Sequence, residues 1–168
     1  MVGDPESVFL YSGSREVFDA HRVTLADLGD PRYLGADPSL AVLYNTALLG
    51  LMYTTMNGFL HASALVGTAH ADPAEFADLA VNWFLTDVVA PMVFQQVPNL
   101  RSGSYPGDVG TMLMNRNALD HIARTSIEQG IHSEQPTFNR DLADRAIAAG
   151  RGEENYFAIY EIFKQATV

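Results

Sequence analysis

Residues 38–71 read PSLAVLYNTALLGLMYTTMNGFLHASALVGTAHA, a run that contains no Asp, Glu, Lys or Arg. Asp37 precedes the run as a candidate N-cap, and Pro38 suits the first helical position. The run therefore predicts one long helix, about 50 Å in length at about 1.5 Å per residue. That length is sufficient to cross a lipid bilayer.

Two environments are compatible with such a helix: a membrane, or a protein interior that includes a second subunit. The run has no flanking Lys or Arg to set a membrane topology. Polar side chains occur within the run, among them Asn45, Thr46, Thr54, Thr55, Asn57, His61 and Ser63. These features favour burial by protein, so we expect no membrane partner.

The segment before the run has α/β character. Residues 7–13 predict a strand, Ser14 an N-cap for a helix that extends to Leu25, and residues 32–35 a second short strand. Strand, helix, strand is typical of one end of an α/β sheet, but two short strands do not form a stable sheet alone. We therefore expect the chain to begin partway through a domain.

The segment after the run predicts only helices and loops, which makes the fold class mostly α. Pro73 begins a helix that Pro98 is expected to stop, and the residues from Arg101 to Asp108 form a turn-rich loop. The predicted helices are 73–97, 109–129, 134–149 and 154–166.

Composition excludes several classes of function. Ten Lys and Arg residues against twenty Asp and Glu give a net charge of -10, and the basic residues do not cluster, so nucleic acid is not an expected partner. The chain has no cysteine, which excludes disulfides and thiol nucleophiles and suits a reducing compartment such as the cytoplasm. The five histidines lack ligand spacing, so no metal is expected.

Candidate site residues lie mainly in the uncharged run. Asn45 and Tyr53 are about two helical turns apart and can converge on a small molecule, although spacing alone favours ordinary packing for both. Trp83, Met114 and Asn115 could line a pocket, but spacing alone favours the core or a loop for them too. No basic residue occurs between Tyr33 and Leu100, so a ligand of this region is expected to be neutral or cationic.

Seven segments occur together in one order along the chain: VFLYSGSREV (8–17), RYLG (32–35), LYNTALLGLMY (43–53), GFLH (58–61), SYPGD (104–108), DRAIAAGRG (144–152) and EIFK (161–164). As a set they resemble one enzyme family, the NADPH-dependent imine reductases and reductive aminases, which are relatives of the β-hydroxyacid dehydrogenases.

The resemblance implies two domains in this chain. Residues 1–36 correspond to the tail of a Rossmann NADP-binding domain, and residues 37–168 to a long interdomain helix plus a helical dimerisation bundle. It also implies a domain-exchanged homodimer with a shared active site. The glycine-rich NADPH site of the family would lie upstream of Met1, so we expect a C-terminal portion that is inactive alone.

The resemblance also assigns roles to residues. Asn45 falls at the proton-donor position, which is commonly Asp or Tyr, and Tyr53 at a second catalytic position. Trp83, Met114 and Asn115 fall at substrate-binding positions. The implied reaction is hydride transfer from NADPH to the C=N bond of an imine or iminium ion, yielding an amine. An amide is no acid, so Tyr53, solvent or a protonated substrate would supply the proton.

Two alternatives remain open from the sequence. A hydroxyacid dehydrogenase of the same superfamily resembles this fold but uses a catalytic Lys on the long helix, and residues 38–71 contain none. A non-catalytic helical dimerisation module would neither bind nor oxidise NADPH, even with the upstream region restored.

Overall fold

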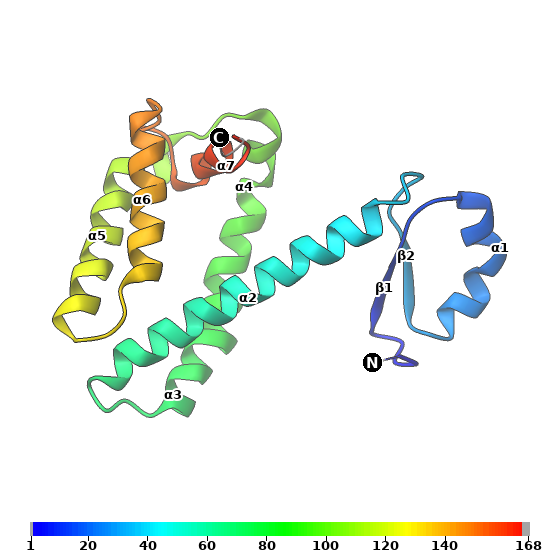
Figure 1. Ribbon diagram of the computed structural model, residues 1–168, viewed down its shortest axis with the longest axis horizontal. Helices are drawn as coiled ribbons and strands as arrows, with labels where there is room; N and C mark the ends of the chain where they lie inside the picture. The colour runs from blue at the N-terminus through cyan, green and yellow to red at the C-terminus, as the bar shows by residue number, and fades with distance from the viewer. Residues whose placement is uncertain (1, 166–168) are drawn as a thin grey trace. The chain divides into compact units, whose positions relative to one another are not determined.

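The computed structural model describes residues 2–165, and these divide into two compact units between Asn57 and Gly58. The first unit contains β1 (Val8–Tyr11), α1 (Arg15–Ala26), β2 (Asp30–Tyr33) and the first part of α2 (Leu40–Gly67). The second contains the end of α2 and all later elements. Figure 1 labels the strands and the α-helices.

A parallel strand pair joined by a helix forms the first unit. β1 and β2 pair in register from Val8 with Asp30 to Tyr11 with Tyr33. The Oγ of Ser14 accepts a hydrogen bond from the Val17 amide and caps α1, as the sequence predicts. Phe18 of α1 is buried, and its ring lies 5.7 Å from that of Tyr11 and 5.2 Å from that of Tyr33. The second strand begins two residues before its predicted position.

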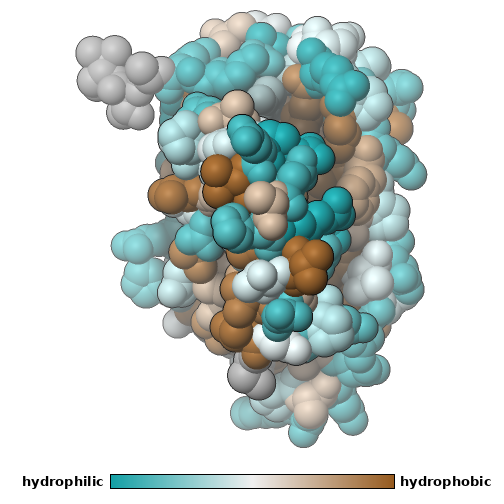
Figure 2. Space-filling view, turned by 90° about the vertical axis from the view of Figure 1, so that its right-hand side faces the viewer, coloured by the Kyte–Doolittle hydropathy of each residue, from teal (hydrophilic) through white to brown (hydrophobic). Residues whose placement is uncertain are grey.

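The uncharged run forms α2, a single helix of 28 residues (Figure 1). It begins at Leu40 rather than Pro38, because Asp37 Oδ1 accepts hydrogen bonds from the amide and hydroxyl of Ser39 and holds these residues in a turn. No described residue of α2 is buried. Its exposed large apolar side chains are Val42, Leu43, Tyr44, Leu48, Leu49, Leu51, Met52, Tyr53, Met56 and Leu60. Figure 2 shows hydrophobic side chains at the surface among hydrophilic ones.

The second unit is helical. A continuous helical stretch comprises α3 (Pro73–Ala77), η1 (Asp78–Val89) and α4 (Ala90–Ser102). The 3₁₀ turn η2 (Gly107–Val109) leads to α5 (Met112–Glu128), which forms an antiparallel hairpin with α6 (Glu134–Ala148; Figure 1). The 3₁₀ turn η3 (Tyr156–Ala158) precedes α7 (Ile159–Phe163).

The core of this unit lies where α5, α6 and α7 meet the loop before η2. Its buried residues are Tyr105, Met112, Leu142, Ala143, Ala146, Ala158, Ile159 and Ile162. Three alanines in this list allow the helices to approach closely. The fold is mostly α, as the sequence predicts.

The predicted helix of residues 73–97 was wrong at its end. Pro98 lies inside α4, which continues to Ser102 and ends at Gly103 with a left-handed φ of 71°. A proline in the last turns removes only one amide donor, and here the remaining turn tolerates that loss. The middle segment, η1, is a π-helix of 12 residues, in which hydrogen bonds span five residues rather than four.

Two later helices are shorter than predicted. The helix predicted from residue 109 begins at Met112, because Thr111 Oγ1 accepts from the Met114 amide and caps it there. The helix predicted over 154–166 is reduced to η3 and α7, and residue 166 lies outside the described residues. One helix of the described chain, Pro73–Ser102, is long and apolar enough to cross a membrane by length and composition, with mean hydropathy 1.3 in its most apolar window.

Candidate active site

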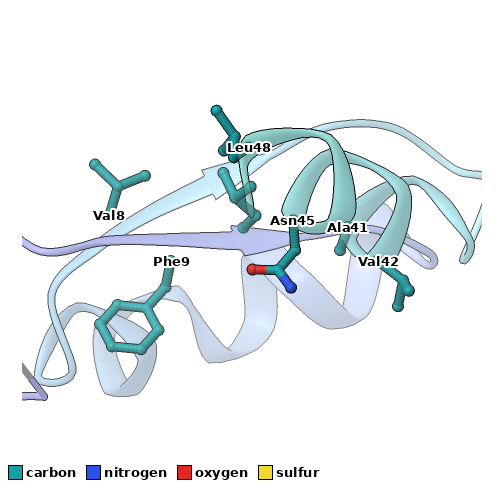
Figure 3. Close-up of a pocket in the computed structure, with 7 residues that line it drawn as sticks. Val8, Phe9, Ala41, Val42, Asn45 and Leu48 are labelled. Carbon is teal, nitrogen blue, oxygen red and sulfur yellow. The ribbon is translucent and has the colours of Figure 1, made fainter. Parts of the chain in front are cut away.

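A cavity of about 550 Å³ lies between β1 and the N-terminal turns of α2. Val8, Phe9 and Leu10 line it from the strand, and Ala41, Val42, Asn45 and Leu48 line it from the helix (Figure 3). The helical residues are spaced as i, i+1, i+4 and i+7, which places them on one face. Asn45 is the one polar side chain among these lining residues.

The amide of Asn45 extends from α2 into this cavity (Figure 3). Within residues 2–165 it makes no side-chain hydrogen bond, so both its oxygen and its nitrogen are available to a ligand. The neighbouring Thr46 differs, because its hydroxyl donates to the Val42 carbonyl 2.9 Å away within the same helix. The cavity therefore offers one orienting amide between apolar walls.

Tyr53 is on α2 but does not line this cavity. Eight residues turn an α-helix through two full turns plus about 80°, so Tyr53 faces a different direction from Asn45. Its side chain is 58% exposed. The expectation that the two converge on one small molecule is therefore not met within this cavity.

The second unit contains another cavity, of about 460 Å³. One wall comes from η1 and α4, a second from the η2–α5 junction and a third from η3. Its lining residues are Asp87, Val88, Pro91, Met92, Gln95, Gln96, Val109, Gly110, Asn115, Asn155, Tyr156 and Phe157. Burial raises the pKa of the Tyr156 hydroxyl, so this phenol stays neutral at physiological pH.

Of the three candidates in this unit, the structure places only Asn115 in that cavity. Its Nδ2 donates to the Thr111 carbonyl at 2.8 Å, which leaves its Oδ1 to accept from a ligand. Met114 and Trp83 are 65% and 51% exposed and do not line the cavity. Trp83 is on η1, the same π-helix that supplies Asp87.

Asn155 holds the walls of this cavity together. It is 3% exposed, and its Nδ2 donates to Gln96 Oε1 and to the Pro106 carbonyl at 3.2 and 2.9 Å. Its Oδ1 accepts from the amide of Phe157, which caps η3. Its contacts thus join α4, the loop before η2, and η3.

Residues 37–165 match the profile of the NADPH-dependent reductive aminase-like C-terminal domain. The chain belongs to this family. The whole of α2 and all elements that line the second-unit cavity lie within the matched part.

Relatives of this reductive aminase-like chain agree with the match. An NADPH-dependent reductive aminase of Aspergillus oryzae is 31% identical over 170 residues, which cover 98% of this chain and 56% of the relative. An imine reductase from Bacillus cereus is 32% identical with a TM-score of 0.91, over 98% of this chain and 57% of that one.

A reductive aminase from Aspergillus terreus, solved in complex with NADPH and ethyl levulinate, is also 32% identical, with a TM-score of 0.87. The match covers 98% of this chain and 57% of that one. The reductive aminase-like chain thus spans a little over half the length of the relatives it matches.

Sequence reasoning missed several residues of these cavities in the reductive aminase-like chain. Asp87, Gln95 and Asn155 carry no local motif, and the wider turn of η1 that presents Asp87 has no recognisable pattern in the sequence. The one available signal was the i, i+4, i+7 spacing on α2, which predicts Ala41 and Leu48 beside Asn45. Among residues 2–165, no group of three or more His, Cys, Asp or Glu is arranged to hold a metal ion.

Proposed function

We propose that the complete gene product containing this chain is an NADPH-dependent oxidoreductase that reduces the C=N bond of imines or iminium ions to amines. The family match over residues 37–165 is the observation that carries this proposal. The proposed active site is the cavity beside Asn45, completed within a domain-exchanged homodimer.

The lining of the Asn45 cavity fits the nicotinamide end of NADPH. Its walls are apolar and its one polar group is an amide, which suits a flat, uncharged ring that carries an amide of its own. The lining contains no basic side chain, and the sequence lacks G-x-G-x-x-G, so the phosphates would be held by residues outside this stretch. For the same reason we propose that the 168 residues alone do not catalyse the reaction. When bound, NADPH supplies the hydride that adds to the C=N carbon.

Asn45 is proposed to orient the substrate and not to act as an acid. Its amide oxygen can accept a hydrogen bond from an iminium N–H, which fixes the direction of the C=N bond. Val8, Val42 and Leu48 are exposed in the single chain. A second copy that covers them would exclude water from the cavity and strengthen that hydrogen bond. Because an amide does not ionise, the proton arrives with the substrate, from Tyr53 or from solvent.

The exposed apolar side chains of α2 support the proposed homodimer. A soluble chain rarely leaves a continuous series of large apolar side chains in water, and a second copy that covers α2 removes them from solvent. A second copy that also covers the apolar helix Pro73–Ser102 would remove its side chains from water without a membrane. We therefore propose a cytoplasmic enzyme and not a membrane protein.

The βαβ arrangement of the first unit supports a larger parent sheet for residues 1–36. Among the described residues β1 pairs only with β2, and a two-stranded parallel sheet is too small to be stable by itself. We propose that β1 and β2 are edge strands of a Rossmann sheet, and that residues 37–168 form the interdomain helix and the dimerisation bundle.

The reaction is tested with the complete gene product, NADPH and a cyclic imine, by following absorbance at 340 nm. Wild type should oxidise NADPH only when the imine is present. Asn45→Ala should lower turnover at least tenfold while leaving the melting temperature within a few degrees, because its side chain is exposed to the cavity. Thr46→Val is the matched control, since its hydroxyl is already bonded within the helix. Unchanged turnover in Asn45→Ala would remove this residue from the mechanism, and no imine-dependent oxidation in wild type would refute the proposed reaction.

The homodimer is tested by light scattering during size-exclusion chromatography. Leu51→Glu places a charge on the exposed apolar surface of α2 and should convert dimer to monomer with loss of turnover. Val23→Glu, on the exposed surface of α1, is the control and should remain dimeric. A dimer that persists in Leu51→Glu would place the interface elsewhere.

A further inference from the structure

Ser12 directly follows β1, and its hydroxyl makes two hydrogen bonds to the chain where α2 begins. The Oγ donates to the Pro38 carbonyl at 2.9 Å and accepts from the Ala41 amide at 3.1 Å. These partners are 26 and 29 residues away along the chain. A hydroxyl has one donor and can also accept, so both bonds can form at the same time. Ser12 therefore joins the end of β1 to the start of α2.

The first turn of α2 takes a hydrogen-bond partner from outside the helix. The first amides of any helix have no carbonyl within that helix to accept from them. Asp37, which precedes α2, uses its Oδ1 on the amide and hydroxyl of Ser39. The Ala41 amide donates instead to Ser12. A residue remote in sequence thus acts as a cap, so the direction of the first turn depends on where Ser12 lies.

The backbone next to Ser12 is itself held in place. The Gly13 amide donates to the Gly35 carbonyl at 2.9 Å, and the Tyr33 hydroxyl donates to the Gly13 carbonyl at 2.7 Å. Gly13 has a φ of 113°, which glycine adopts readily and other residues rarely do. The Tyr33 ring lies 5.2 Å from the ring of the buried Phe18. Ser12 is therefore a fixed point against which α2 is set.

The turn that Ser12 holds leads directly to Asn45. Ala41 and Asn45 are about one helical turn apart, and both line the cavity beside β1 (Figure 3). Residues 8–10 of β1, the strand that precedes Ser12, form the other wall. A shift of the first turn of α2 against β1 would change the separation of these walls and the direction of the Asn45 amide. Reaction rates fall steeply when a group that orients the substrate is displaced.

We propose that Ser12 is a positioning residue for the reaction at Asn45, because its hydroxyl fixes the first turn of α2 against β1 and with it the Asn45 amide. Ser12 is not among the residues that line the cavity, so it acts through Ala41 and the helix and does not touch the substrate. The inference rests on the proposed function, in which Asn45 orients the C=N bond.

The kinetic test measures kcat for the cyclic imine in the complete gene product. Ser12→Ala removes the hydroxyl and should lower kcat about three- to tenfold. Ser12→Thr retains a hydroxyl on the same carbon and should restore most of that loss. Ser14→Ala is the matched control, because it makes the same substitution at the cap of α1, where the Oγ accepts from the Val17 amide. It should lower the melting temperature about as much as Ser12→Ala does, but leave kcat within about twofold of wild type.

A double variant distinguishes an effect that passes through Asn45 from a general loss of structure. If Ser12 acts through Asn45, adding Ser12→Ala to Asn45→Ala should change kcat by less than about twofold. Independent effects would multiply instead. The inference is overturned if Ser12→Ala leaves kcat unchanged, if Ser14→Ala lowers kcat as much, or if the losses in the double variant multiply.

A second measurement needs no turnover and separates this inference from the proposed reaction. With 15N-labelled asparagine in the complete gene product, the side-chain amide resonances of Asn45 are identified by their absence from Asn45→Ala. They should shift in Ser12→Ala and not in Ser14→Ala. If they do so but wild type oxidises no NADPH with the imine, the proposed reaction fails and the positioning of Asn45 stands. If wild type reduces the imine but neither kcat nor these resonances respond to Ser12→Ala, only the present inference fails.

Discussion

Replacing Gly107 with alanine tests how the loop of residues 104–108 is held in the second unit. A Cβ at this position would overlap the backbone carbonyl oxygen of Glu153 and would lie 3.2 Å from Thr111 Cγ2. The obstructing atom belongs to the backbone, so the chain around Glu153 must move rather than a flexible side chain. The φ of Gly107 is not left-handed, which makes this contact the sole expected cause of destabilisation.

Three hydrogen bonds fix the segment that must move. The Leu113 amide donates to the Gly152 carbonyl at 3.1 Å and the Met112 amide to Glu154 at 2.6 Å, while the Asn155 amide donates to Tyr105 at 3.0 Å. At about 1 kcal/mol for each hydrogen bond lengthened or lost, Gly107→Ala should lower the free energy of unfolding by about 2–4 kcal/mol. For a chain of this size that corresponds to a fall of about 4–16 °C in melting temperature.

The assay is thermal and urea unfolding followed by circular dichroism at 222 nm. Gly103→Ala is the control: its φ of 71° strains an alanine by about 1 kcal/mol, but its Cβ would meet no atom within 4 Å. If Gly107→Ala costs no more than Gly103→Ala, the packing of this loop against residues 152–155 is not as described.

Three further predictions follow from other contacts. Hydrogen bonds from Lys164 and Tyr105 lower the pKa of the Glu161 carboxyl in the folded state, so the stability that they contribute is complete above the pKa of the unfolded chain and is lost as pH falls through the folded pKa. Urea unfolding at a series of acid pH values should show this fall in the free energy of unfolding, and Glu161→Gln should make it smaller. Burial, and then the bond to Glu161, raise the pKa of Tyr105 to about 12, so stability present below pH 10 should fall as pH rises towards 12, and Tyr105→Phe should abolish this alkaline loss. Titrating the 168-residue chain alone with NADPH, by cofactor fluorescence, should show no binding, whereas micromolar binding would mean that a phosphate site exists within this stretch.

Local chemistry explains which elements the sequence could predict. Ser14 caps α1 with its own side chain, and an uninterrupted uncharged run forms α2, so both follow from neighbouring residues. The prediction that Pro98 ends the helix was wrong because the destabilisation by a proline depends on how much helix follows it. In α4 the helix continues only to Ser102. The π-helical geometry of η1 is likewise invisible in a pattern of apolar spacing.

Only those residues of the candidate site that share one face of a single helix could be predicted from the sequence. Asn45 follows from its place in α2, and the structure adds the cavity beside β1. The second cavity joins residues as distant in sequence as Asp87 and Asn155, and nothing local marks either. Tertiary packing alone brings such residues together, so their roles required the structure.

In the proposed reaction, the neutral side chain at position 45 has a definite electrostatic consequence. A neutral amide at Asn45 avoids a fixed negative charge beside the C=N bond, where it would stabilise the iminium ion and oppose the loss of its charge on reduction. A carboxyl group at position 45 should therefore orient the iminium ion less favourably but be able to donate a proton. The pH profile of turnover in Asn45→Asp should gain an ionisation that wild type lacks.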